Sequence, residues 1–222
     1  YSRIKIAILS SKLNDLLGNY VGKETRDKLV LSKKEISSSK ENITLLYSDI
    51  RNFTVMSEKY NAQDVVKTLN SYYSIWDEII TTSKGNINKF VGDAVLGIFD
   101  DSTNISNTVE CCIDMLNQLP KLNKELANNN LPIVENIGIA IHYGEVILGN
   151  IGSNRKDYTV IGDNVNIVAR IESLCKEYKK QLLISEVCYE KFEENLQKKF
   201  INIENIQLKG KEKKVTIYAY EK

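Results

Sequence analysis

The stretch FVGDAVLGIF at residues 90–99 contains a single carboxylate, Asp93, inside a run of apolar residues and glycines. Gly92 and Asp93 separate two short apolar runs, a pattern typical of a β-hairpin with a tight turn. A second isolated acid, Asp49, lies near the end of another strand-like run, ITLLYSDI at residues 43–50. If that strand lies beside the hairpin, the two acids meet at one edge of the sheet, where their charges repel unless a cation such as Mg²⁺ lies between them. The pattern therefore indicates a divalent-cation site, with two unrelated turn aspartates as the alternative.

Predicted strands and helices alternate along the rest of the chain, and several strand pairs are predicted to be hairpins. We therefore expect an α+β fold, in which helices flank a mixed or antiparallel sheet around a strand-helix-hairpin-helix-strand core. The second hairpin is expected to turn at Tyr143-Gly144-Glu145. The predicted elements are strands over 43–50, 86–91, 94–99, 136–151 (the second hairpin), 158–161, 181–185, about 200–208 and about 214–220, and helices over about 62–83, 105–128, 163–179 and 186–196.

The first 42 residues are predicted to form a separate segment, an N-terminal helix with a linker, ahead of a domain over 43–222. Apolar residues within 1–31 recur at alternating spacings of three and four, which is typical of a coiled-coil seam, with a helix folded back on its own domain as the alternative. Residues 33–42 are polar and are expected to be the linker. The seam is formed by Ile6, Leu9, Leu13, Leu16 and Tyr20.

Composition and charge exclude several classes of function. The chain has 30 basic and 29 acidic residues, so no overall field favours nucleic acid or an anionic membrane surface. No apolar run approaches the roughly 20 residues of a membrane span. The four cysteines have no metal-ligand spacing and are expected to be reduced core residues. We expect a cytoplasmic domain without direct membrane contact, although the full-length protein could be membrane-attached.

Three motifs together closely resemble the catalytic domain of class III adenylyl cyclases. They are LLYSDIRNFT at 45–54, NKFVGDAVLGIF at 88–99 and DYTVIGDNVNIVAR at 157–170. The resemblance covers residues 43–220. It implies a ferredoxin-like core and a head-to-tail homodimer with two active sites at its interface, where ATP becomes 3′,5′-cyclic AMP and pyrophosphate.

The resemblance assigns the two acids to metal binding. Asp49, Asp93 and the backbone carbonyl of Ile50 would hold two Mg²⁺ or Mn²⁺ ions. One ion would lower the pKa of the ribose 3′-hydroxyl, and the other would bind the β- and γ-phosphates, so no separate protein base is required.

The backbone after the first acid is expected to wrap the triphosphate with its N–H groups. This loop includes Asn52, Phe53 and Thr54. The family usually has glycine where this chain has Asn52. Asparagine tolerates a left-handed backbone better than other non-glycine residues, so the loop is expected to keep its shape.

Two residues are expected to select the base. Lys89 matches the family's adenine-reading lysine, whereas guanylyl cyclases typically have glutamate there, so the substrate is expected to be ATP. Without the resemblance, Lys89 would be interpreted as a solvated strand lysine. Thr159 stands where many relatives have aspartate, which resembles the subgroup that includes bicarbonate-responsive cyclases.

Asn166 and Arg170 lie four residues apart and therefore share one helix face. In the family, the asparagine positions the ribose and the arginine stabilises transition-state charge on the α-phosphate, a task suited to a planar, permanently charged guanidinium. A surface ion pair of Arg170 with Glu172 or a neighbouring acid is the alternative. Lys209 matches a lysine that contacts the β- and γ-phosphates, and Arg155 is expected to reach the triphosphate from the metal-bearing side.

In the family, the acids come from one subunit and the base-reading and transition-state residues from the other. The N-terminal helix would then connect an upstream sensory domain to the geometry of the dimer. The only histidine, His142, is expected in the core or an interface. The alternatives are a guanylate cyclase and a non-catalytic nucleotide-sensing or dimerisation module; a diguanylate cyclase would have Gly-Gly-Asp-Glu-Phe in its hairpin.

Overall fold

The structure is a computed structural model that describes residues 11–12, 38–101, 103–153, 157–206 and 214–221. The chain divides into two compact units. The larger unit comprises residues 41–146 and 162–222, and the smaller comprises residues 1–40 and 147–161. Most of the predicted N-terminal helix, with residues 33–37 of the linker, lies outside the described residues.

The described strands form a mixed sheet in the order β2-β3-β1-β4-β6-β8-β7. Neighbours are antiparallel in the pairs β1–β3, β2–β3, β6–β8 and β7–β8, whereas β4 and β6 are parallel. This confirms the expected α+β architecture. The strands are β1 (Ser39–Ile50), β2 (Asn86–Val91), β3 (Ala94–Asp100), β4 (Ile137–Ile151), β6 (Leu182–Ser185), β7 (Phe200–Ile206) and β8 (Val215–Tyr220).

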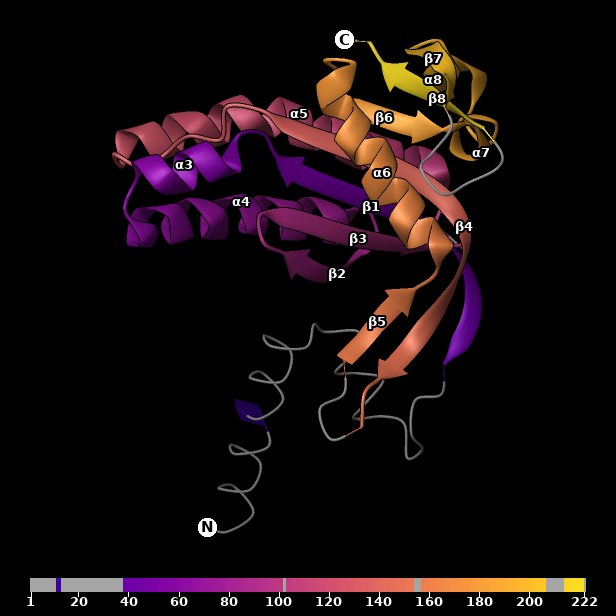
Figure 1. Ribbon diagram of the computed structural model, residues 1–222, viewed down its shortest axis with the longest axis horizontal. Helices are drawn as coiled ribbons and strands as arrows, with labels where there is room; N and C mark the ends of the chain where they lie inside the picture. The colour runs from indigo at the N-terminus through magenta and orange to yellow at the C-terminus, as the bar shows by residue number, and fades with distance from the viewer. Residues whose placement is uncertain (1–10, 13–37, 102, 154–156, 207–213, 222) are drawn as a thin grey trace. The chain divides into compact units, whose positions relative to one another are not determined.

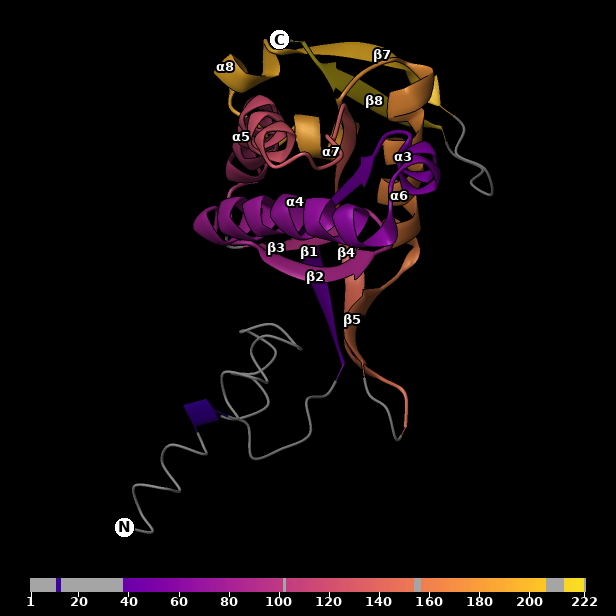
Figure 2. The ribbon, with the colours of Figure 1, turned by 90° about the vertical axis from the view of Figure 1, so that its left-hand side faces the viewer.

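Helices cover both faces of the sheet in the larger unit, with α5 and α6 on opposite sides (Figures 1 and 2). Helix α4 packs against α5 and the β2–β3 hairpin, and α6 packs against β6. The short helix α3 follows β1 directly. The helices are α3 (Phe53–Lys59), α4 (Ala62–Thr82), α5 (Ile105–Asn128), α6 (Asp163–Glu177), α7 (Glu186–Tyr189) and α8 (Glu194–Gln197).

The core follows from the periodicities of the sequence. Tyr72 and Trp76 of α4 are fully buried and belong to one cluster with the apolar face of α5. Ile139 and Ile141 of β4 face this cluster, while Ala140 between them is equally buried outside it. Successive strand residues point to opposite faces, so β4 is apolar on both faces because each is covered.

Strand β4 differs from the prediction of a second hairpin. It runs without a turn from Ile137 to Ile151, pairing first with β6 and then with β5 (Asp157–Ile161). The φ angle of Gly144 is not positive. A Cβ on Gly144 would lie 2.4 Å from Nδ2 of Asn164. The glycine therefore permits close approach by a side chain instead of reversing the chain.

Two other boundaries also differ. β1 begins at Ser39, so residues 39–42 are strand instead of linker. The helix predicted over 186–196 is two short helices, α7 and α8, separated at Phe192. Phe192 is buried with its ring 5.6 Å from that of Phe200. We attribute the interruption to this packing.

In the smaller unit, β5 pairs antiparallel with the last residues of β4, and Thr159 lies opposite Gly149. A Cβ on Gly149 would lie 2.6 Å from Cα of Ser38, which shows how closely the chain entering β1 approaches it.

All four cysteines are buried and free, as expected for reduced core residues. Among the described helices, none combines the length and the apolar character needed to span a bilayer.

Candidate active site

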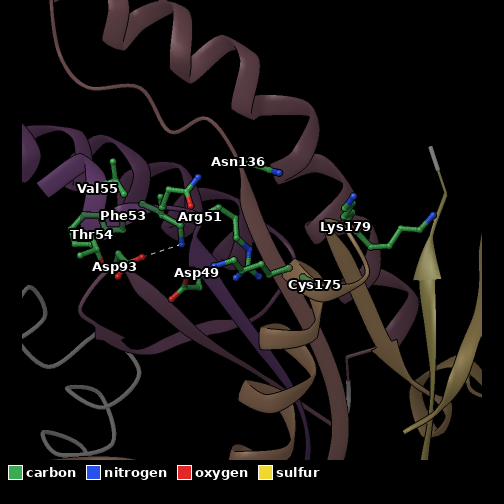
Figure 3. A pocket seen from close by; sticks show the side chains of 13 residues that line it. Asp49, Arg51, Phe53, Thr54, Val55, Asp93, Asn136, Cys175 and Lys179 are labelled. Atoms are coloured by element: carbon green, nitrogen blue, oxygen red, sulfur yellow. Dashed lines mark hydrogen bonds between the residues drawn. The ribbon is translucent and has the colours of Figure 1, made fainter. Parts of the chain in front are cut away.

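The two isolated acids lie in one pocket of about 640 Å³ in the larger unit (Figure 3). The pairing of Ser48 with Val95 brings the end of β1 next to the β2–β3 turn. At that turn Gly92 has a φ of 64°, and the N–H of Ile50 donates to Oδ2 of Asp93 at 3.2 Å. The expectation that Asp49 and Asp93 meet at one sheet edge is therefore confirmed.

Both carboxyl groups are easier to protonate than ordinary aspartates. Burial raises the pKa of Asp49, and the charge of Asp93 raises it further. Burial also raises the pKa of Asp93, against hydrogen bonds from its own N–H and that of Ile50. The Arg51 guanidinium lowers both pKa values. A cation between the carboxylates would offset their mutual repulsion.

The donors fit a hard divalent cation. In the described part of the chain, no group of three or more His, Cys, Asp or Glu side chains could hold a metal. A cation here would therefore take the two carboxylates, a backbone carbonyl, water and substrate oxygens. Mg²⁺ sites commonly have this composition, with one or two carboxylates plus phosphates.

The loop after β1 has the predicted left-handed residue. Asn52 has φ 60° and ψ 26° and is the N-cap of α3. The next three residues, 53–55, line the pocket with Asn52. The first N–H groups of a helix have no partner within that helix, so this end of α3 presents donors at the pocket.

A buried ion pair beside the acids was missed by the sequence analysis. Nη2 of Arg51 donates to the main-chain oxygen of Glu172 at 3.0 Å and also contacts the Glu172 carboxylate. The Glu172 residue is 5% exposed. Burial raises its pKa to about 7, although Arg51 lowers it. Glu172 thus pairs with Arg51, which leaves a neighbour other than Glu172 as the alternative ion-pair partner of Arg170.

A signal for this pair exists in the sequence. Glu172 lies four residues after Val168 and three before Cys175, both buried, and so falls on the apolar side of α6. An acid on a buried face needs a partner of opposite charge. The sequence did not indicate which of the 30 basic residues provides it.

The other expected site residues lie elsewhere. Among the described residues, the pocket lining does not include Lys89, Asn166 or Arg170. Asn166 is exposed and Arg170 half-buried on α6, while Lys89 is half-buried on β2 opposite Leu96.

Thr159 lies on β5 in the smaller unit. Arg155 and Lys209 fall outside the described residues, so their assignments remain predictions. The pocket is also lined by four residues at the end of α6 and beyond it, which the sequence did not indicate as site residues. They are Cys175, Lys176, Lys179 and Lys180.

His142 connects β4 to the start of α6. Its Nδ1 lies 2.8 Å from Oγ of Ser185, and its Nε2 lies 3.0 Å from Oδ1 of Asn164. Nδ2 of Asn164 donates to the carbonyl of Glu145 at 2.7 Å. His142 is buried, which agrees with the expected core role.

Comparison with known proteins identifies the family of this chain. Residues 35–221 match the family model of the adenylate and guanylate cyclase catalytic domain. The adenylate cyclase of Anabaena cylindrica is 35% identical over 193 residues, which cover 82% of this chain and 37% of that protein. The chain thus spans little more than a third of that relative's length.

Solved structures with this fold include cyclases of both specificities. A bacterial light-regulated adenylyl cyclase matches with a TM-score of 0.84 and 25% identity, covering 97% of this chain and 63% of that one. The guanylyl cyclase Cya2 matches with a TM-score of 0.73 and 33% identity, covering 82% and 93%. The chain belongs to the class III adenylyl and guanylyl cyclase catalytic-domain family.

Proposed function

We propose that this domain is an adenylate cyclase that converts ATP to 3′,5′-cyclic AMP and pyrophosphate. The observation that carries the proposal is the meeting of Asp49 and Asp93 in one pocket, beside the left-handed loop at Asn52, in a chain of the cyclase family. In the reaction, the ribose 3′-oxygen forms a bond to the α-phosphorus, the bond from that phosphorus to the bridging oxygen breaks, and the hydroxyl proton is lost.

Asp49, Asp93 and the carbonyl of Ile50 would hold two Mg²⁺ or Mn²⁺ ions, which activate the hydroxyl and stabilise the leaving pyrophosphate when bound. The raised pKa values of the two acids support this assignment, because a cation relieves the cost of keeping both ionised. The N–H groups of Phe53 and Thr54 would contact the triphosphate.

The active unit is proposed to be a homodimer with shared sites. Lys89, Asn166 and Arg170 do not line the acid pocket of their own chain among the described residues. In the dimer they would complete the site of the partner subunit, together with Thr159 and Lys209, while Arg155 would serve the triphosphate. The domain is proposed to work in the cytoplasm as the output of an upstream sensor connected through residues 1–42.

The test is an assay of the purified chain with ATP and with GTP in Mn²⁺ over a range of protein concentrations. Cyclic AMP should be the main product, and specific activity should rise with concentration because each site needs two chains. A guanylate cyclase is the second candidate, favoured by the 33% identity to Cya2. Cyclic GMP as the main product would establish that candidate, and absence of both products at every concentration would support a non-catalytic module.

Mixing two inactive variants tests the shared site directly. Asp93→Asn removes an acid and Arg170→Ala removes the proposed transition-state donor. A 1:1 mixture should recover about a quarter of the wild-type rate, because half of the dimers are mixed and each of these has one intact site. No recovery, with dimers present by sedimentation, would contradict shared sites.

A further inference from the structure

Arg51 is a potential competitor for the metal in the proposed site. It follows Ile50 directly, lines the same pocket as Asp49 and Asp93, and is close enough to lower the pKa of both acids. Guanidinium groups bind carboxylates with paired hydrogen bonds. An Arg51 side chain without another partner would therefore bind the carboxylates that a divalent cation needs and compete with that cation.

The Arg51 guanidinium lies in a slot formed by Glu172 and Gly138. Arg51 donates from its side chain to both the carboxylate and the main-chain oxygen of Glu172, and from its backbone N–H to the carbonyl of Asn136 at 2.9 Å. Its side chain is 17% exposed. A Cβ on Gly138 would lie 1.7 Å from Nη2 of Arg51 and 2.3 Å from Oε1 of Glu172. Only glycine at this position of β4 leaves room for the pair.

We propose that Glu172 is a positioning residue that withholds the Arg51 guanidinium from Asp49 and Asp93, so that both carboxylates stay available to divalent cations. When Glu172 is ionised its pair with Arg51 is neutral, and the ionised Asp49 and Asp93 offer two negative charges to the metal. Loss of the Glu172 charge would leave Arg51 to pair with the acids, and the charge available to the metal would fall by one. This inference rests on the proposed metal site of a cyclase.

The test measures Mn²⁺ binding to the full 222-residue chain without nucleotide, from the electron paramagnetic resonance signal of free Mn²⁺. Glu172→Gln should weaken binding about tenfold, because an interaction energy of about 1.4 kcal/mol is within the range of contacting charges. Arg51→Gln should bind as tightly as wild type or more tightly. The double variant should bind like Arg51→Gln, because the competitor is gone.

This recovery distinguishes positioning from a purely structural role. If Glu172 only stabilised the fold, adding Arg51→Gln would leave binding as weak as in Glu172→Gln or weaker, and that result would overturn the inference. Glu194→Gln is the matched control, because Glu194 at the start of α8 forms an exposed ion pair with Lys198, the residue that follows this helix, at 3.5 Å. It should leave Mn²⁺ affinity unchanged.

A second route does not alter Glu172. Gly138→Ala should displace the guanidinium from its slot and weaken Mn²⁺ binding, and Arg51→Gln should restore much of it. If Glu172→Gln fails to fold, as seen by circular dichroism, this pair of variants decides the matter, and absence of recovery contradicts the inference.

The outcomes separate this inference from the proposed function. Wild-type turnover with unchanged Mn²⁺ affinity in both Glu172→Gln and Gly138→Ala would overturn the inference alone. A wild-type chain that binds no Mn²⁺ and turns over no nucleotide would overturn the proposed function and the inference with it.

Discussion

The acid pocket and helix α6 both carry proposed active-site residues, and they are built differently. In the pocket, Asp49 and Asp93 are partly buried and close enough for the charge of Asp93 to raise the pKa of Asp49, the Ile50 N–H donates to Asp93, and the Arg51–Glu172 ion pair lies beside them. On α6, Asn166 is exposed. The acid pocket is organised within a single chain, while α6 leaves Asn166 exposed, where the second chain of the proposed dimer would contact it.

The largest difference between the regions should come from removing an acid. Asp93→Asn should lower cyclic AMP production by at least about a thousandfold, because the metal contributes several kcal/mol to transition-state stabilisation. Mn²⁺ binding should be lost as well. Asp64→Asn is the matched control, because Asp64 lies in the first turn of α4, pairs with Lys67 and does not line the pocket, and it should leave the rate unchanged. A rate within tenfold of wild type would contradict the metal role.

Arg170→Ala should have a smaller effect on the rate and none on the metal. One transition-state donor contributes about 3 kcal/mol, so kcat should fall roughly a hundredfold while the KM for ATP changes little. Mn²⁺ affinity should equal that of wild type, in contrast to Asp93→Asn. Equal losses of metal affinity in the two variants would remove the distinction between the regions.

The acid pocket, together with Glu172 beside it, should respond to pH, whereas the face of α6 that carries Asn166 and Arg170 should not. The pKa values of Asp49 and Asp93 are raised mainly by burial, so protons should displace Mn²⁺ at a higher pH than the ordinary aspartate value of about 3.9 would imply. In the metal-free protein, the folded state holds these protons more tightly than the unfolded state. The free energy of unfolding should therefore fall as pH rises from about 3.9 through the raised pKa values, and Mn²⁺ should reverse the loss.

Mn²⁺ titrations and thermal melts across this pH range measure both effects. Asp93→Asn should reduce the pH dependence of metal-free stability and leave the part that comes from Glu172, whose pKa burial raises to about 7, whereas Arg170→Ala should keep all of it. The free energy of unfolding of the metal-free protein could instead rise with pH in this window and be unchanged by Asp93→Asn. That result would show that the ionised acids do not destabilise the folded state.

The smallest expected effect is at Asn52. Its left-handed backbone suits glycine, so Asn52→Gly should change the free energy of unfolding by less than about 1 kcal/mol, whereas Asn52→Ala should cost about 1–2 kcal/mol. Chemical denaturation measures both. If Asn52→Ala is as stable as wild type, the loop does not require the left-handed conformation.

Local signals explain what the sequence predicted well. The β2–β3 hairpin was found because Gly92 and Asp93 reverse the chain within a few residues, and α4 because its buried positions recur with helical spacing. These features depend only on neighbours in sequence, whereas the end of β1 reaches the β2–β3 turn through its pairing with β3, which joins distant residues such as Ser48 and Val95.

The failures have a common physical cause. Gly144 resembles a turn residue, but its small size serves Asn164, which is 20 residues away in sequence, and the hairpin prediction was therefore wrong. Arg51 and Glu172 are 121 residues apart, so no local pattern connects them. A single sequence does not show whether a residue is needed for its contact with a distant residue or for its own backbone conformation.

Helix α6 is tied to the rest of the larger unit at both ends. Asn164 binds His142 near its start, Glu172 binds Arg51, and the thiol of Cys175 contacts the carbonyl of Ile139 at 3.4 Å. A shift of the loop at Arg51 would therefore also displace α6, the helix that carries Arg170. In a dimer with shared sites, nucleotide binding at one active site would then change the position of residues at the other. The two active sites would in this way be able to bind nucleotide cooperatively or to work in alternation.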